Sequence, residues 1–186
     1  ALISLGRYDE VLSMHEERIN SVADETVRAD GFFRLSLLHE KLRDDVQASN
    51  FCLAAWLDLA PHNEQGQLRY GSLLSSEGDF EAAKPRFEQL IEDSDDELLL
   101  ADAYAGLGRC RRALGEDVQL VIDDLQRAAA LSDRSDMHRE LGQIYLLAEE
   151  PELAQMTFKN MERVAASPAE VLLSQLGQVE ALLDAG

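Results

Sequence analysis

Apolar residues recur every three or four positions along nearly the whole chain, with polar and charged residues between them. An interval of three to four residues is the period of an α-helix that buries one side, whereas a half-buried strand alternates at every second residue. Glycine and proline are scarce, and clusters of β-branched residues are few. The pattern therefore predicts an all-α fold.

A second pattern repeats over a longer distance. A large apolar residue followed at once by glycine recurs along the chain, and in four of these pairs the steps between successive glycines are 37, 34 and 35 residues. After two of these pairs comes an alanine with an aromatic residue four positions later. The four pairs are Tyr70-Gly71, Leu107-Gly108, Leu141-Gly142 and Leu176-Gly177, and the later residues are Ala83 with Phe87 and Ala154 with Phe158.

A period close to 34 residues with these features resembles the tetratricopeptide repeat family. The resemblance implies a right-handed α-solenoid of antiparallel helix pairs, in which a small residue lets the first helix of a pair lie close against the second. The alanine and the aromatic residue of the second helix would fill the space between neighbouring pairs. Because no single repeat closes its own core, each repeat would depend on its neighbours.

The repeats can be delimited along the chain. The opening LGRYDEVL (5–12) looks like the turn and second helix of a repeat whose first helix is missing, so we expect a fragment of a larger protein. A first helix is expected at 29–42, a turn at 43–45 and a second helix that ends in LAPHN at 59–63. We predict one repeat domain over 1–186, made of a partial repeat 1–28, repeats 29–63, 64–100, 101–134 and 135–169, and a truncated first helix 170–186.

The charge of the chain narrows the class of partner. There are 36 acidic and 17 basic side chains, which gives a formal net charge of -19. Such a chain would repel the phosphate backbone of nucleic acids and anionic membrane surfaces. No apolar run approaches the roughly 18 residues that a membrane-spanning helix needs. We therefore expect a protein or peptide partner, no nucleic acid and no membrane insertion, and the compartment stays open between cytoplasm and periplasm.

The residue types that carry catalysis do not form a recognisable constellation. The four histidines are isolated from one another, and we interpret them as surface or groove residues. Paired carboxylates such as Asp123-Asp124 are interpreted as solvated faces or helix N-caps. Cys52 and Cys110 lie in apolar runs and are expected to be free, buried thiols, and Trp56 is expected to pack in the interior. We predict no enzyme activity, no cofactor and no metal site.

The remaining signal is the groove that the resemblance implies. In that family, side chains at about the second, fifth, ninth and twelfth positions of each first helix line the concave surface, where partner polypeptides lie. Five basic residues would face this surface and attract an acidic segment, since arginine can bind a carboxylate through two hydrogen bonds. The mapped positions are Arg34, Lys41, Leu68, Ser72, Ser75, Asp102, Ala105, Arg109, Arg112, Asp136, Arg139, Gln143 and Leu146, of which Arg34, Lys41, Arg109, Arg112, Arg139 and Gln143 are the predicted partner-binding residues.

Two alternatives stay open at this point. The arginines can instead pair with nearby acids such as Glu140 or Asp136, because exposed ion pairs are common. The chain can also serve as a structural spacer or an envelope assembly module within a larger protein, for example in a bacterial scaffold for polysaccharide export. A homodimer formed by stacking of the truncated ends is a further expectation. The favoured prediction is a non-enzymatic scaffold that binds a partner polypeptide in its concave groove.

Overall fold

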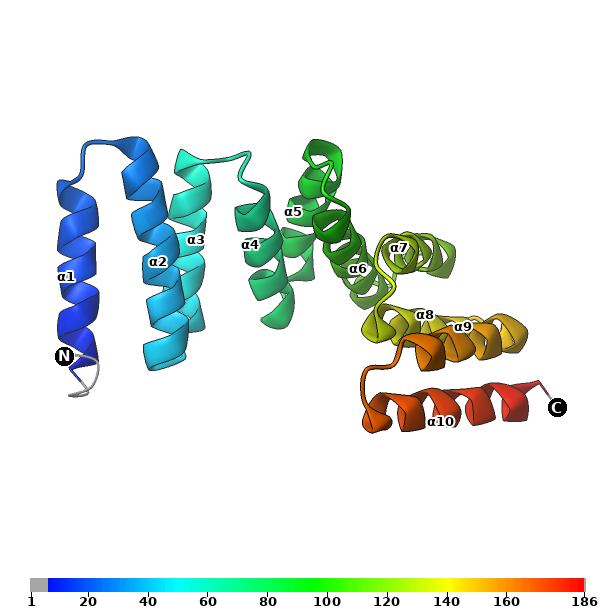
Figure 1. Cartoon of the computed structure of the whole chain (residues 1–186). Helices are drawn as coiled ribbons and strands as arrows, with labels where there is room; N and C mark the ends of the chain where they lie inside the picture. The colour runs from blue at the N-terminus through cyan, green and yellow to red at the C-terminus, as the bar shows by residue number, and fades with distance from the viewer. Residues whose placement is uncertain (1–6, 186) are drawn as a thin grey trace. The chain divides into compact units, whose positions relative to one another are not determined.

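The computed structural model describes residues 7–185, and these residues form ten α-helices and no strand (Figure 1). The chain divides into two compact units, Ala1–Asp79 and Phe80–Gly186. The first unit contains α1 (Tyr8–Ser21), α2 (Glu25–Arg43), α3 (Val46–Leu59) and α4 (Glu64–Ser76). The second contains α5 (Phe80–Asp93), α6 (Glu97–Ala113), α7 (Val118–Leu131), α8 (Ser135–Leu147), α9 (Pro151–Val164) and α10 (Pro168–Asp184). The predicted all-α fold is confirmed. Leu5 and Gly6, which open the first predicted turn, lie outside the described residues.

Short polar side chains fix where most of the helices begin. Asp24 accepts hydrogen bonds from the backbone N–H groups of Thr26 and Val27, and Asp96 accepts from those of Leu98 and Leu99. These groups have no partner inside a helix, so a side-chain oxygen that satisfies them stabilises the first turn. Asp45, Asn63, Asp117 and Ser167 cap α3, α4, α7 and α10 in the same way.

In the first unit, each helix packs against the next one along the chain. Leu12, Ile19, Leu35 and Cys52 form one apolar cluster between α1, α2 and α3. A second cluster surrounds Trp56, whose ring centroid lies 4.4 Å from that of Phe33. Trp56 is buried, so the prediction that it packs in the interior is confirmed.

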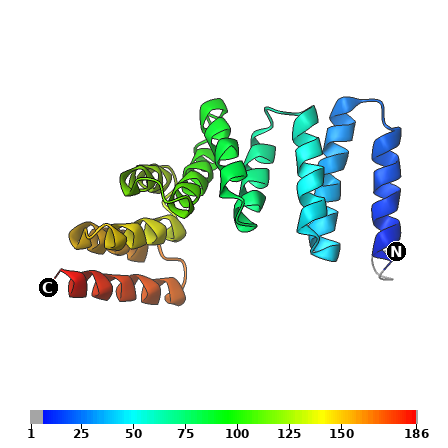
Figure 2. The same ribbon diagram turned by 180° about the vertical axis from the view of Figure 1, so that it is seen from behind.

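In the second unit, one continuous core runs from α6 to α10. Figures 1 and 2 show α8, α9 and α10 side by side. The ring of Phe158 in α9 lies between Gly142 of α8 and Gly177 of α10, and a Cβ atom on either glycine would come within 2.8 Å of it. Glycine at these two positions therefore lets three helices share one aromatic ring, as the repeat pattern predicts.

The structure corrects two interpretations of polar residues. His39 and His138 are buried rather than exposed, and a ring nitrogen of His138 lies 2.9 Å from a carboxylate oxygen of Asp133. Asp124 is also buried, not solvated, and it accepts a hydrogen bond of 2.8 Å from Arg111. Asp124 lies three residues after Val121 and four before Ala128, so it shares the buried face of α7.

Both cysteines are buried and neither forms a disulfide, as predicted. Burial raises the pKa of the Cys52 thiol to about 11, and the carboxylates of Glu16 and Asp45 add to this effect. Among the described helices, none is both long and apolar enough to cross a membrane.

Candidate functional site

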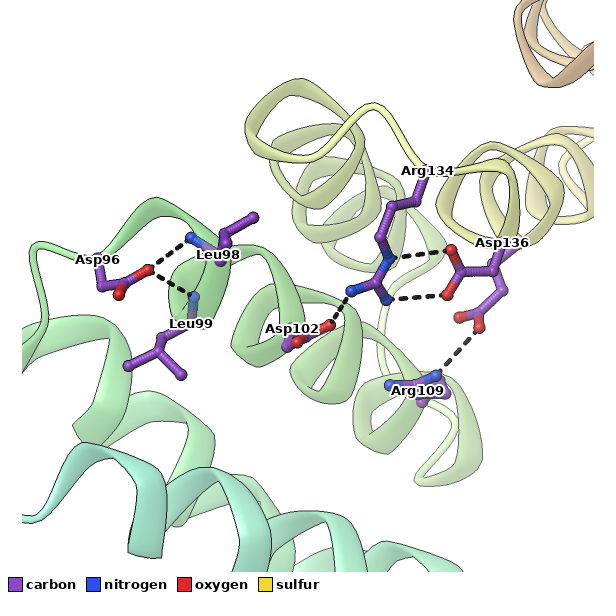
Figure 3. A network of polar contacts seen from close by, with 8 residues as sticks. Asp96, Leu98, Leu99, Asp102, Arg109, Arg134 and Asp136 are labelled. Carbon is purple, nitrogen blue, oxygen red and sulfur yellow. Dashed lines mark hydrogen bonds and ion pairs between the residues drawn. The ribbon is translucent and has the colours of Figure 1, made fainter. Parts of the chain in front are cut away.

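The candidate site of the second unit is the surface shared by α6 and α8, which carries the mapped groove positions of these two helices except the buried Ala105. Direct ion pairs join the two helices at this surface (Figure 3). Arg109 of α6 donates a hydrogen bond of 3.0 Å to Glu140 of α8. Near the start of both helices, Arg134 lies 2.9 Å from Asp102 and 2.9 Å from Asp136. Asp102 and Asp136, which are mapped positions on successive first helices, thus share one arginine, and part of the charge of this surface is neutralised.

Arg134 joins the starts of the two helices. It occupies the N-cap position of α8, and its guanidinium reaches back to α6. The hydrogen bond from Arg134 holds the pKa of Asp136 below its ordinary value, and the same bond raises the pKa of Arg134. The sequence prediction missed Arg134 because it lies at a repeat boundary rather than at a groove position. The acidic neighbours Asp133 and Asp136 in the sequence could have identified Arg134 as a residue that forms ion pairs.

The positive charge of Arg109 is already paired with a carboxylate of the protein itself. Its side chain is 51% exposed and that of Glu140 is 22% exposed, so the ion pair lies at the surface. Exposed pairs of this kind contribute only about 0–1 kcal/mol of stability. The alternative that a groove arginine pairs with Glu140 therefore holds for Arg109, whose charge is less available to a partner than expected.

Three other predicted partner-binding residues are available to contact a ligand. Arg112 and Gln143 are exposed and Arg139 is partly exposed, and no side-chain partner is found for them in the range 7–185. Each carries N–H groups that can donate to a carboxylate or a backbone carbonyl. The mapping is wrong for Ala105, which is fully buried in the core of the second unit rather than lining the groove.

The first unit carries Arg34 and Lys41, both exposed on α2 and seven positions apart. Arg34 forms an ion pair of 2.9 Å with Asp30, one turn earlier on the same helix. It also borders a concavity of about 300 Å³ between α1 and α2, together with His15, Arg18 and Ile19. Lys41 has no ion pair within the described part of the chain. These two residues form a surface of their own on this unit.

Within residues 7–185, no three His, Cys, Asp or Glu side chains lie close enough together to hold a metal ion. One polar cluster around a histidine consists of His138, Asp133 and Arg163, in which Arg163 donates to both oxygens of Asp133. The hydrogen bonds from His138 and Arg163 hold the pKa of Asp133 below its ordinary value. Because Asp133 stays ionised and paired, it serves to join α9 to the start of α8.

The fold is that of the tetratricopeptide type, an all-α solenoid of helix pairs. The MamA protein of Desulfovibrio magneticus RS-1 aligns with a TM-score of 0.72 at 20% identity, over 89% of this chain and 92% of that one. The C-terminal part of a TPR repeat-containing protein from Cytophaga hutchinsonii aligns with a TM-score of 0.75 at 15% identity, over 99% of this chain and 69% of that one.

A third similar structure is that of the APC/C hetero-tetramer Cut9-Hcn1, with a TM-score of 0.69 at 18% identity. The alignment covers 97% of this chain but 34% of the other one. The sequence itself matches no protein-family model and no curated protein. At these identities the similarity establishes the fold.

Proposed function

We propose that the chain is a non-enzymatic scaffold that binds a partner polypeptide on the surface shared by α6 and α8. The proposal is carried by Arg112, Arg139 and Gln143, whose side chains are exposed or, for Arg139, partly exposed and have no side-chain partner in the range 7–185. Arg109 and Arg134 pair with three carboxylates, those of Glu140, Asp102 and Asp136, which leaves one negative charge against the two positive charges of Arg112 and Arg139. A ligand would therefore meet a locally basic strip on an otherwise acidic protein.

The partner segment that suits this strip is acidic. With a formal net charge of -19, the chain repels acidic ligands everywhere except where basic side chains outnumber the acids. Arg112 and Arg139 can each hold a carboxylate through two hydrogen bonds, and Gln143 can bind a backbone amide. The same net charge disfavours nucleic acid as a partner. That one of the similar structures is the hetero-tetramer Cut9-Hcn1 supports the general use of this fold in assemblies.

The test compares charge reversals at matched positions. The parent chain is used for capture from native lysate beside Arg112→Glu with Arg139→Glu, and beside Lys159→Glu as a control. Lys159 is an exposed residue of α9, so its reversal changes the net charge without touching α6 or α8. We expect the parent and the Lys159→Glu variant to capture the same polypeptide, and the double variant to lose it.

The captured polypeptide then supplies the decisive ligand. Its acidic segment is synthesised beside a version with Asn and Gln in place of Asp and Glu, and circular dichroism checks that all variants remain folded. Binding of the acidic peptide should weaken as salt is raised, since charge pairs at a surface are screened. Equal capture by the parent and the double variant would contradict this surface as the binding site, and no capture by either would favour the structural spacer.

We also propose that two copies of the chain associate end to end, through exposed apolar residues of their terminal helices. Light scattering at high protein concentration measures the mass directly. A dimer mass would support the stacking, and a monomer mass would remove it while leaving the groove proposal intact.

A further inference from the structure

Helices α1 and α2 lie side by side in opposite directions (Figure 1), and a concavity of about 300 Å³ lies between them. Gly31 of α2 marks their close approach, because a Cβ atom there would come within 2.6 Å of the Cγ1 atom of Ile19 on α1. Ile19 is buried, so it forms the floor of the concavity together with the backbone of Gly31. Val27 and Arg34 lie one turn to either side of Gly31 on the same face of α2, and they form part of its walls.

The two ends of the concavity differ in chemistry. Val22 and Val27 border it close to the short link between the two helices, and Val27 is 56% exposed. His15, Arg18 and Arg34 border it further from that link. One end of the concavity is therefore aliphatic and the other carries the basic side chains.

The basic end keeps hydrogen-bond donors for a ligand. Arg18 is exposed, and no side-chain partner is found for it in the range 7–185. The Nε atom of Arg34 lies 2.9 Å from Asp30, which leaves the terminal nitrogens of this guanidinium to donate elsewhere. The Nδ1 atom of His15 donates to the carbonyl oxygen of Val11 at 2.9 Å, and this bond fixes the ring as a wall. The lining thus carries two arginines against one carboxylate, in a chain with a formal net charge of -19.

The volume of the concavity limits the size of the ligand. It equals the liquid volume of about ten water molecules, which is enough for a molecule of about eight non-hydrogen atoms. Guanidinium groups bind carboxylates through paired hydrogen bonds, so the basic end suits a carboxylate. The two valines would remove an aliphatic chain from water, which is favourable in proportion to the area covered.

We propose that the concavity between α1 and α2 is a binding site for a small organic acid with a branched aliphatic chain. The carboxylate would lie against Arg18 and Arg34, and the aliphatic chain would lie against Val22 and Val27. This site belongs to the first unit and is independent of the polypeptide surface on α6 and α8.

The probe is isocaproate, which joins a carboxylate to a branched aliphatic chain of suitable size. Isocaproamide has the same shape without the charge, and acetate has the charge without the chain. Each is titrated into the whole chain while the backbone amide signals are followed by NMR. We expect saturable shifts at Ile19, Val27 and Gly31 with isocaproate, and binding at least about tenfold weaker for either control compound.

Two variants separate the charged from the aliphatic contribution. Arg18→Gln with Arg34→Gln should weaken binding of isocaproate by at least about tenfold, because both guanidinium groups would contact the carboxylate. Val27→Ser should bring the affinity for isocaproate close to that for acetate. Lys159→Gln removes a positive charge from exposed α9 in the second unit, and it should bind isocaproate like the parent. All the replaced side chains are exposed, so circular dichroism should show the same helix content in every variant.

Four results would overturn the proposal. Equal binding of isocaproate and isocaproamide would remove the role of the carboxylate, and unchanged binding to the double arginine variant would place the ligand elsewhere. Shifts at Arg112 and Arg139 with the same midpoint as those at Gly31 would show general pairing of anions with arginines. An acidic peptide that displaces isocaproate from this concavity at lower concentrations would identify a polypeptide as the occupant instead.

Discussion

The close approach of α9 and α10 gives a prediction that can be worked out from distances. Substitution Gly177→Ala would place a Cβ atom 2.6 Å from two ring carbons of Phe158 and 2.7 Å from a third. Ordinary contacts of this kind are 3.4–4 Å, so the ring or the helix would have to move by about 0.8 Å. The ring cannot move away freely, because Gly142 of α8 lies close against it on another side.

Two opposing effects set the size of the change. Alanine is favoured over glycine inside a helix by about 1 kcal/mol. Forcing an extra methyl group into a close-packed site costs about 1–3 kcal/mol, and three clashing atoms of a rigid ring place this site near the upper end. The net expectation is a loss of about 2 kcal/mol in the free energy of unfolding. For a chain of this length that corresponds to a decrease of roughly 4–8 °C in Tm.

Gly108→Ala is the matched control, since Gly108 lies inside α6 of the same unit. A Cβ atom there would lie 3.2 Å from the Cγ atom of Leu125, which is a flexible side chain that can shift by a few tenths of an ångström. The helix-propensity gain should then prevail, so we expect Gly108→Ala to be neutral or stabilising by up to about 1 kcal/mol. Urea unfolding followed by circular dichroism measures both variants. Amide hydrogen exchange of α10 reports any local loosening.

The double variant tests the stated cause. If the ring of Phe158 is what opposes the methyl group, Gly177→Ala should cost much less in a Phe158→Leu background, with a coupling of about 1 kcal/mol or more. Should Gly177→Ala be as stable as Gly108→Ala, or should Phe158→Leu leave its cost unchanged, the argument from close packing would be wrong.

Three further predictions concern buried groups. Arg111→Met should lower the free energy of unfolding by roughly 3 kcal/mol in urea melts at pH 7, because it leaves the carboxylate of Asp124 buried without its partner. Burial raises the pKa of Asp124 to about 6, so the folded state binds more protons than the unfolded state between about pH 4 and pH 6. The free energy of unfolding should therefore fall by up to about 1.4 kcal/mol per pH unit as pH rises through this window. The Asp124→Asn variant should lack this contribution. The same pH dependence of stability in the variant and the parent would contradict the prediction. Cys52 and Cys110 should react slowly with a thiol reagent at pH 8 until urea unfolds the chain, and rapid reaction of the native protein would show that the described burial is wrong.

The fold could be predicted because its causes recur along the sequence. The glycines of successive pairs lie at a nearly constant period, and the structure places Gly142 and Phe158 in contact. The start of α2 was placed at residue 29 instead of Glu25, because the prediction followed the apolar period and overlooked the cap. Asp24 is a residue type that caps helices, and it accepts hydrogen bonds from the N–H groups two and three residues later. Its presence in the sequence could have shown that the helix begins at Glu25.

The buried polar residues were harder to predict, for two different reasons. Asp124 follows the apolar period of α7, so its position on the buried face could have been seen from Val121 and Ala128. Its partner Arg111 lies on another helix, and no local pattern pairs them. The burial of His39 and His138 likewise depends on which helices pack over them, which a single sequence does not show.

The same reason explains why the charge of the groove could be predicted only in part. Arg109 and Arg112 lie one turn apart on α6 and looked equivalent when each was mapped by its position within one repeat. Glu140 of the next helix pair lies within reach of Arg109, whereas Arg112 has no such partner among the described residues. Whether a groove residue has an ion-pair partner therefore depends on the residues of the neighbouring repeat. A change at Glu140 should release Arg109 and make this surface more basic without altering any groove position.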